Sequence, residues 1–402
     1  MVSADEIKRN IEENWIKFLK TNSAKLSLKT LRGATPPSIF VGRFGYPKVK
    51  VGPMLSPLHG DTKILDTPEM WIGKTLGDIV NYRTSLIRGV VPGVDVRKAS
   101  GKYIESLQEL SMSKKSANAE AVFEKLPVVE FEHGKNYAAE LENAPFGPVA
   151  PLKSFKTSSS LSTEHGIQNA YYDKDLPATQ AIVGLYQRGI EVSRIQRVLS
   201  MGMLGLQKKR RLVPTRWSVT ATDDAISSDL VSRIELHPTI NFFEVYKYFH
   251  MGNYYFIILI PDDVWNFEMH EAWFDSNGNL GTVADFEDAR GLDHYPSIAG
   301  AYFAARLGVT EYLFNRRRKA AALVLREIRP EYIIPVGVWQ IREGVREAFK
   351  GQRGEFDSFE KALDFACIGS SVSGTEWIKN SVIYRNMIQQ RRITEFSERD
   401  SL

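Results

Sequence analysis

The 402-residue sequence predicts an α+β fold, in which a mixed or antiparallel sheet packs with helices. Segments with helical periodicity and short β-branched or aromatic segments follow one another without the regular alternation of a doubly wound sheet. The composition, 43% hydrophobic and 25% charged, is that of an ordinary globular protein. A chain of this length can therefore bury a full core, in two or three domains or in one large one.

The N-terminal part combines one amphipathic segment with a glycine-punctuated strand. Residues 5–20 predict a helix, because their apolar positions recur at helical spacing. The stretch Ser38–Met54 predicts a strand bounded by turns, since two valines alternate with two lysines between positions 48 and 51. Ser111–Ala119 and Lys153–Ser162 have no apolar period and are expected to be linkers or exposed loops, the second one mobile.

The segment Pro177–Leu206 is helical in pattern and breaks at Arg188–Gly189. Apolar residues on both sides of the break would pack two helices together, with Ser193 capping the second. This pattern is compatible with a DNA-binding helix-turn-helix and with an ordinary helical hairpin. The hairpin is favoured, because the same spacing serves any two packed helices.

The C-terminal half continues with both kinds of element. Trp217–Thr222, Phe242–Tyr248 and Tyr254–Pro261 are β-branched or aromatic and predict strands, the last of them central. The Gly-, Asn- and Asp-rich segment Asp275–Pro296 predicts a domain boundary. Three elements are expected after it: a long helical segment at Ser297–Ile328, a strand at Tyr332–Ile341 and a helix at Ser358–Cys367.

Composition excludes several classes of protein. No apolar run reaches the ~18–20 residues that span a bilayer, and residues 1–20 lack an export signal. Cys367 is the one cysteine, so the chain has neither an intramolecular disulfide nor a thiolate-ligated zinc finger. A cytoplasmic protein without a membrane partner is therefore expected. The net charge of +4 permits nucleic-acid binding without requiring it.

Several stretches, spread over most of the chain, carry a resemblance to a known family. They are Ser38–Met54, Arg210–Asp224 (RRLVPTRWSVTATDD), Phe242–Pro261, Ala299–Leu313 and Leu323–Phe349. On these stretches the chain resembles the Nre family of archaeal DNA-repair proteins. The resemblance implies a role in the response to DNA damage, a larger N-terminal region and a smaller C-terminal one.

The same resemblance implies a division of the chain and a partner. The N-terminal region is placed at 1–275, the C-terminal region at 276–388, and a flexible tail that binds a PCNA-type sliding clamp at 389–402. Many relatives begin with a cysteine-rich, zinc-finger-like segment. This chain has no cysteine before Cys367, so no structural zinc is expected.

The tail matches most of a clamp-binding peptide, whose pattern is Gln-x-x-(Leu/Ile/Met)-x-x-aromatic-aromatic. One helical turn of such a peptide projects its aliphatic and aromatic side chains into a single hydrophobic pocket. Gln390, Ile393 and Phe396 occupy the first three defining positions. Ser397 stands where a second aromatic residue is expected, so a weaker affinity than that of a full match is predicted.

Two basic segments are candidates for DNA contact. The densest cluster follows the predicted helical pair and precedes Trp217; it comprises Lys208, Lys209, Arg210, Arg211 and Arg216. A second candidate interleaves Arg43, Lys48 and Lys50 with two aromatic residues and with glycines that allow close approach to a phosphate backbone. Lysine and arginine neutralise phosphates, and aromatic rings stack on exposed bases. A solvated helix end is the alternative interpretation of the first cluster.

No complete catalytic signature is present, but one set of polar groups suits metal-assisted phosphodiester cleavage. Asp223 and Asp224 follow one predicted strand, and Glu268, His270 and Glu271 lie in FEMHEAWFD. If the two groups converged at neighbouring strand ends, they could hold Mg²⁺ or Mn²⁺, with the histidine as base or ligand. Structural use of these residues, as caps, turns or exposed strand positions, is the favoured alternative.

Three functions remain open from the sequence. The leading one is a cytoplasmic, nucleoid-associated DNA-repair factor that binds DNA and the sliding clamp. The others are a metal-dependent nuclease or other phosphodiester hydrolase acting on damaged DNA, and a non-catalytic adaptor between the clamp and repair enzymes. Divalent-metal dependence distinguishes the hydrolase from the other two, and salt-sensitive DNA binding distinguishes the first function from the adaptor.

Overall fold

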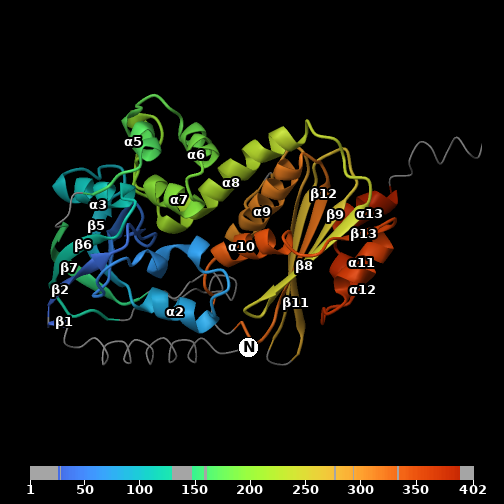
Figure 1. Ribbon diagram of the computed structural model, residues 1–402, viewed down its shortest axis with the longest axis horizontal. Coiled ribbons are helices and arrows are strands. Elements are labelled where there is room, and N and C mark those ends of the chain that lie inside the picture. Colours follow the sequence, from blue (N-terminus) through green and yellow to red (C-terminus); the bar gives the residue numbers. More distant parts are fainter. Residues whose placement is uncertain are drawn as a thin grey trace, which may run out of the picture. The chain divides into compact units, whose positions relative to one another are not determined.

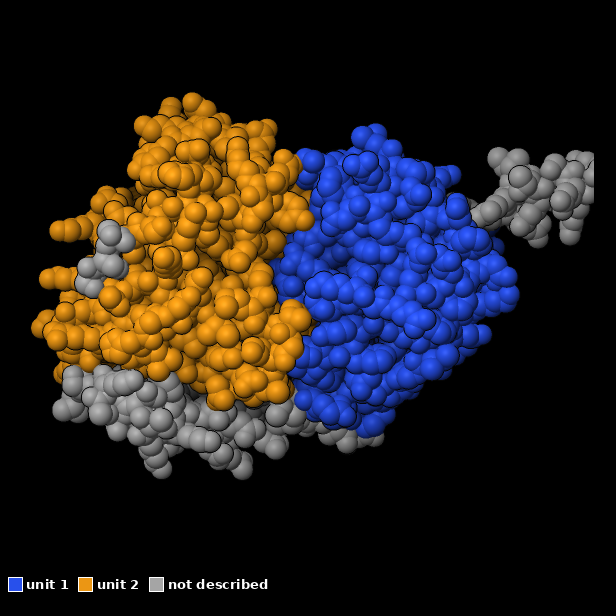
Figure 2. All heavy atoms as spheres, viewed as in Figure 1, with its two compact units in different colours: residues 1, 227–332, 341–402 blue, residues 2–226, 333–340 orange. Residues whose placement is uncertain are grey.

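The computed structural model divides the chain into two compact units (Figure 1, Figure 2). It describes residues 26–27, 29–128, 147–157, 161–275, 278–292, 294–332 and 335–389. Of these, residues 227–332 and 341–389 belong to unit 1, and residues 26–226 and 335–340 belong to unit 2. The expected region boundary at 275/276 falls inside unit 1, in the turn between two strands. The amphipathic helix expected at 5–20 lies outside the described residues.

Unit 2 contains a mixed sheet, which has seven strands in the described residues. Its order is β1-β2-β6-β7-β5-β4-β3, and every neighbouring pair is antiparallel except the parallel pair β5 and β7. The strands are β1 (Leu26–Ser27), β2 (Thr30–Thr35), β3 (Ile39–Val41), β4 (Lys48–Leu55), β5 (Ile87–Asp95), β6 (Ala117–Phe123) and β7 (Val149–Thr157). The inward residues of five of these strands share one apolar cluster, which includes Leu31, Leu55 and Phe123.

Helices and short 3₁₀ turns complete unit 2. They are η1 (Lys63–Asp66), η2 (Pro68–Met70), α2 (Leu76–Thr84), α3 (Lys102–Met112), α5 (His165–Tyr172), α6 (Ala178–Gln187), α7 (Val192–Ser200) and η3 (Gln207–Lys209). The pair α6 and α7 confirms the helical hairpin with a break at Gly189, whose φ of 76° is a conformation that glycine adopts readily. The predicted cap was wrong: Ser193 lies inside α7, and Glu191 precedes the helix without a side-chain cap.

Unit 1 contains a second mixed sheet, with six strands in the part of the chain that the structure describes. Its order is β11-β10-β12-β9-β8-β13, with one parallel pair, β10 and β12. The strands are β8 (Phe243–His250), β9 (Asn253–Ile260), β10 (Phe267–Phe274), β11 (Leu280–Glu287), β12 (Ala321–Ile328) and β13 (Gly354–Phe356). The strands expected at Phe242–Tyr248 and Tyr254–Pro261 are thereby confirmed, and β9 is an interior strand as its apolar run predicted.

Helices cover both faces of this second sheet (Figure 1). On one face α11 (Phe359–Cys367), α12 (Gly374–Ile378) and α13 (Val382–Gln389) bury an apolar cluster with alternate strand residues such as Phe256 and Leu323. On the other face lie α9 (Gly300–Arg316) and α10 (Trp339–Ala348). In α10, Gly344 lets the helix approach the sheet closely, because a Cβ there would lie 2.4 Å from the Tyr255 ring.

The strand expected at Trp217–Thr222 was wrong, because this segment belongs to the long helix α8 (Thr215–Ile234). Its Thr, Val and Trp content favoured a strand locally. The positions buried in the structure are instead four apart, which is the spacing of one helix face. They are Ser218, Thr222, Ile226, Leu230 and Ile234, and Asp223 and Ser227 beside them on the same side are buried as well. Tertiary burial therefore overrode local propensity.

Three other segments also differ from expectation. The first half of the loop expected at Lys153–Ser162 belongs instead to β7, an interior strand. It forms a strand because Phe155 packs on the sheet core while its polar neighbours face outward. The helical segment expected at Ser297–Ile328 ends at Arg316, and its second half is β12. The strand expected at Tyr332–Ile341 was wrong in its described part, because Gly337 has a φ of 103° and α10 begins two residues later.

The linker or exposed loop expected at Ser111–Ala119 is confirmed only in its middle, where residues 113–116 join α3 to β6, because its ends belong to the helix and to the strand and are largely buried. The helix expected at Ser358–Cys367 is confirmed as α11, which Ser358 caps. The two mixed sheets and their helices confirm the α+β class. In the described ranges, none of the helices combines the length and the apolar composition that crossing a membrane requires.

Strands β4 and β5 approach so closely that a side chain at Gly52 cannot fit. A Cβ there would lie 1.6 Å from the carbonyl oxygen of Gly89. We predict that Gly52→Ala lowers the free energy of unfolding by about 3 kcal/mol or more, because backbone rather than a side chain must move. The measurement is urea unfolding followed by circular dichroism.

The matched control is Gly77→Ala in α2, where an added Cβ meets only an ordinary contact 3.8 Å away. That change is expected to raise the unfolding free energy by roughly 0.5–1 kcal/mol, since alanine favours a helix over glycine. Equal stability of the two variants would contradict the steric argument.

Candidate nucleic-acid interface

The predicted basic segment that comes first along the chain, with Arg43, Lys48 and Lys50, forms the β3–β4 hairpin of unit 2. Val49 and Val51 are buried, while Lys48 and Lys50 are exposed, so the alternation places both ammonium groups on the outer face. The turn of the hairpin carries Phe44, which is 54% exposed.

The glycines of this hairpin serve its own backbone. Gly45 has a φ of 79°, which the turn requires, and its carbonyl oxygen accepts a hydrogen bond from Lys48 N at 2.9 Å. Gly42 lies against Lys50, whose carbonyl oxygen would be 3.2 Å from an added Cβ. Both glycines are therefore explained without a phosphate, which removes one reason for placing DNA here.

The second basic segment runs from η3 to the first turn of α8. Lys208, Lys209 and Arg211 are exposed. Arg210 instead turns inward: its guanidinium donates to the carbonyl oxygens of Gly205 (2.7 Å) and of Tyr171 (2.6 Å). It also donates to two further carbonyls at the end of α5, where a cation favourably meets the helix dipole. Arg210 is thus committed to the protein's own backbone.

Val96 joins the two basic segments. Its N–H donates to Pro47 O in the hairpin at 2.9 Å, and its carbonyl accepts from Leu212 N at 3.0 Å. A further bond, from Val41 N to the Thr215 hydroxyl at 2.9 Å, fixes the start of α8 to strand β3. Segments that are more than 150 residues apart in sequence are therefore neighbours in unit 2.

Aromatic side chains meet at this junction. The rings of Tyr46 and Trp217 have their centroids 5.1 Å apart at an angle of 50°, and the two side chains are 42% and 46% exposed. Arg216, the last predicted basic residue, is half-buried beside Trp217, and Arg43 lies with its guanidinium 5.0 Å from the Phe44 ring centroid. The two predicted DNA-binding segments thus contact each other through this ring pair.

The sequence interpretation missed two exposed basic residues, Arg97 and Lys98, which follow Val96 directly. A lone pair of basic residues is too common to single out, and only the hydrogen bonds of Val96 connect it to the rest. We call the exposed side chains here the junction surface. They are Phe44, Tyr46, Lys48, Lys50, Arg97, Lys98, Lys208, Lys209, Arg211 and Trp217.

The candidate catalytic residues fall into different settings. Asp223 and Asp224 lie in the middle of α8, within unit 2, and not at the end of a strand as expected. The Asp223 side chain is buried and accepts a hydrogen bond from Gln196 Nε2 at 3.1 Å. Glu268, His270 and Glu271 lie on strand β10 in unit 1. The prediction that the candidate residues lie on strands is therefore confirmed for these three residues alone.

Glu268 holds the start of α13. Its carboxylate accepts hydrogen bonds from the Ser381 hydroxyl at 2.7 Å and from the N–H groups of Val382 and Ile383, each at 2.9 Å. His270 Nε2 lies 2.9 Å from the same carboxylate. Burial acts to raise the pKa of Glu268, but the hydrogen bonds from His270, Ile383 and Ser381 hold that pKa below its ordinary value of 4.5.

Glu271 points to the opposite face of the sheet from Glu268, as an odd spacing along a strand requires. Its carboxylate pairs with Arg326 Nη1 at 2.5 Å, and Arg326 also donates to Asn253 Oδ1. Burial acts to lower the pKa of Arg326, but the charge of Glu271 raises it above its ordinary value. The contacts of Glu268 and Glu271 favour the structural interpretation that the sequence left open.

Comparison with known proteins reveals two family models that together match most of the chain. The model described as Archaeal Nre, N-terminal matches residues 8–277, and the one described as Archaeal Nre, C-terminal matches residues 287–396. The chain belongs to the Nre family. The compact units of this Nre chain divide elsewhere, within α8 and again within α10.

Curated relatives resemble the Nre chain over nearly their whole length. The DNA repair protein NreB of Archaeoglobus fulgidus is 38% identical over 92% of each chain. The DNA repair protein NreA of the same organism is 35% identical over 85% of each, and the NreA of Haloferax volcanii is 34% identical over 83% of this chain and 81% of its own. No solved structure matches the chain.

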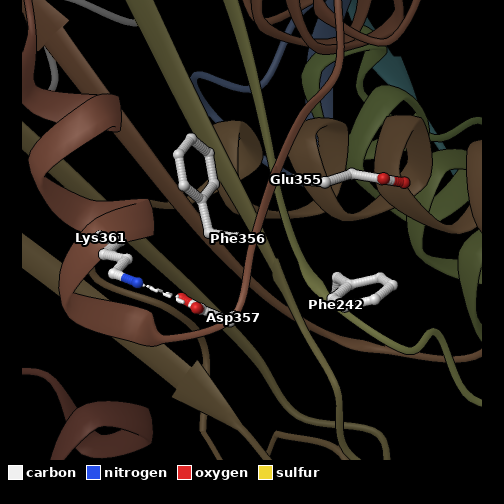
Figure 3. A pocket seen from close by; sticks show the side chains of 5 residues that line it. All are labelled: Phe242, Glu355, Phe356, Asp357 and Lys361. Carbon is white, nitrogen blue, oxygen red and sulfur yellow. Dashed lines mark hydrogen bonds and ion pairs between the residues drawn. The ribbon is translucent and has the colours of Figure 1, made fainter.

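Other features of the Nre chain offer less chemistry. Within the described residues, no three His, Cys, Asp or Glu side chains are grouped so that they could hold a metal ion. A shallow depression of about 430 Å³ in unit 1 is lined by Phe242, Glu355, Phe356, Asp357 and Lys361 (Figure 3). Its lysine and aspartate pair with each other at 2.8 Å, and its glutamate pairs with Arg353 at 2.7 Å. The predicted clamp-binding residues Gln390, Ile393 and Phe396 lie outside the described residues.

The hydrogen bonds of Glu268 generate a pH-dependent prediction. Because the folded pKa lies below 4.5, the stability contributed by this carboxylate is present above pH 4.5 and is lost as the pH falls through the folded value. We expect Glu268→Gln to lower the unfolding free energy by about 2–4 kcal/mol at neutral pH, since buried donors at the start of α13 lose a charged acceptor. The deficit should shrink on acidification below pH 4.5.

Urea unfolding of both proteins across this pH range tests the prediction. Glu355→Gln, which changes a half-exposed carboxylate in the same unit, is the control and should change stability by no more than about 0.5 kcal/mol. A deficit for Glu268→Gln that stays constant with pH would show that the ionised carboxylate is not what holds the helix.

Proposed function

We propose that this protein is a DNA-repair factor that binds DNA through the junction surface and a PCNA-type sliding clamp through residues 390–396. It would act at the nucleoid in the cytoplasm. Its relatives are named DNA repair proteins, which supports the repair role at the level of the family.

One observation carries the DNA-binding half of the proposal. The two segments that Val96 brings together, residues 43–50 and 207–217, contain eight Lys or Arg residues and no Asp or Glu. Arg210 serves the fold, but the exposed members project from a framework of backbone hydrogen bonds. A dense set of cations on a fixed framework suits a phosphate backbone, because each phosphate that is neutralised releases condensed counterions.

The clamp half of the proposal depends on the sequence of the tail. Gln390, Ile393 and Phe396 have the spacing of a clamp-binding peptide. The match to the Nre C-terminal model extends to residue 396, so it includes all three. A short peptide that occupies a hydrophobic pocket through one aliphatic and one aromatic anchor is a common mode of recognition.

The first prediction concerns salt. We expect the triple change Lys208→Gln, Lys209→Gln and Arg211→Gln to weaken binding to a DNA duplex and to flatten its salt dependence. Removing one ion pair with a phosphate should reduce the slope of log affinity against log salt by about 0.9, so up to about 2.7 for three. Fluorescence anisotropy titrations over a range of salt concentrations measure both quantities.

The matched control removes the same charge from unit 1, by changing the exposed Lys350, Lys361 and Lys379 to Gln. This control should bind DNA with the slope of the unchanged protein. If the junction variant keeps that slope while the protein remains folded, DNA binding through this surface is refuted. A protein that binds no DNA at all would favour the adaptor.

The second prediction concerns the clamp. Deleting residues 390–402 is expected to abolish binding to the sliding clamp and to leave the unfolding free energy of the rest unchanged, because a terminal peptide ligand adds little to a core. The Phe396→Ala change should cost at least about 2 kcal/mol, or roughly 30-fold in affinity, because it removes the aromatic anchor. Isothermal titration calorimetry measures these affinities.

Thr394→Ala, between two anchors, is the control and should bind as the unchanged protein does. Ser397→Phe restores the missing second aromatic residue and should tighten binding. If the clamp affinity survives the deletion, the binding site lies elsewhere in the chain.

A further inference from the structure

We propose that Tyr46 and Trp217 form a stacking platform for unpaired bases, so that the junction surface binds single-stranded DNA in preference to duplex. This inference rests on the proposed function and adds to it the class of DNA that the surface takes. It depends on the exposure of the two rings, on the hydrogen bonds that fix the backbone carrying them and on the charges around them.

Among the tryptophans that the structure describes, Trp217 alone is exposed. Trp71, Trp265 and Trp377 are at most 1% exposed, whereas Trp217 is 46% exposed. Tyr46, whose ring lies 5.1 Å from that of Trp217, is 42% exposed. Large aromatic side chains gain free energy from burial, so an exposed pair that contacts itself offers ring faces to a partner.

Hydrogen bonds fix the backbone on both sides of the ring pair. Trp217 lies in the first turn of α8, where its N–H donates to Pro214 O at 2.8 Å and the preceding Thr215 hydroxyl accepts from Val41 N. Tyr46 precedes Pro47, whose carbonyl accepts from Val96 N. Because this backbone is already fixed, a base that stacks on the rings restricts only their side-chain rotation.

The surrounding charge distinguishes a nucleic acid from a protein partner. The exposed lysines at 48, 50, 208 and 209 and Arg211 flank the rings in sequence and belong to segments without an acidic residue. The core of a protein–protein interface is depleted of lysine, whereas sites for single strands combine a positive groove with aromatic rings. The composition of the junction surface is that of the second kind.

Base stacking on protein rings selects single strands. In a duplex each base face is covered by its neighbours, so an exposed ring can reach it only after the base is unstacked. Phosphate groups are accessible in both forms of DNA. The cations should therefore contribute to both, and the rings to single strands alone.

The experiment compares the full chain with its Trp217→Ala and Tyr46→Ala variants on an oligonucleotide of about 16 nucleotides, the upper end of the range for compact single-strand sites, and on the matching duplex. Each ring variant is expected to lose roughly 5- to 150-fold in affinity for the single strand and less than about twofold for the duplex. A fluorescent purine analogue in the strand should be quenched by the unchanged protein and less so by Trp217→Ala at saturation.

Trp217→Phe keeps a ring and should retain most of the preference. Tyr295→Ala, which removes a more exposed ring from unit 1, is the control and should leave both affinities unchanged. Tyr46 lies in a turn, so its variant stays informative even if Trp217→Ala unfolds.

The outcomes separate the two proposals. Equal losses of affinity for single strand and duplex, or no loss from either ring variant, would overturn the stacking platform. Salt-dependent binding that the Lys208, Lys209 and Arg211 changes weaken would still support the proposed function in that case. Absence of DNA binding in any form would remove both.

Discussion

The candidate interface depends on the backbone of Val96. Its N–H and carbonyl bond to Pro47 and Leu212, and in doing so they place a hairpin from the start of the chain beside the approach to α8. Val96 and Leu212 are themselves almost fully buried, so these two hydrogen bonds are shielded from competing water. At the other end of the second segment, Arg210 binds the carbonyls that end α5. Its role shows that residues within one basic cluster can divide between holding the fold and facing a ligand.

Buried charge in unit 1 follows a consistent pattern. Glu271 pairs with Arg326, Glu287 with Arg306 and Glu244 with Arg316, so each of these buried carboxylates faces a guanidinium. The ionised carboxylate of Glu268 is stabilised in another way, by hydrogen bonds from the N–H groups and the hydroxyl at the start of α13. Such pairs are costly to break, because the remaining partner would be a buried unpaired charge. Of the acidic residues that the sequence offered as a catalytic set, Glu268 thus attaches helix α13 to the sheet, whereas Glu271 joins strand β10 to strand β12 through Arg326.

If the junction surface binds DNA as proposed, phosphate attraction and base stacking would complement each other there. The attraction between the cations and DNA extends over about a Debye length and weakens with salt, which suits a first encounter with any DNA. Ring stacking acts only at close range and only where bases are unpaired. Repair intermediates contain such unpaired stretches beside duplex. The proposed clamp peptide at residues 390–396 would add a second attachment and so raise the local concentration of DNA at the surface.

The sequence by itself determined the α+β class, the interior strand β9, the helical pair around Gly189 and the outward lysines of β4. These features follow from local periodicity, because the spacing of residues in a helix or strand decides which face of it their side chains occupy. It also supplied both basic segments, although not their proximity. Tertiary structure decided the rest. The segment α8 is a helix because positions four apart are buried, and β7 is a strand because β5 and β6 pair with it on either side. Arg210 faces inward because α5 ends beside it. Pairings such as Tyr46 with Trp217 join residues 171 positions apart, and no local pattern records which distant segment will supply a partner.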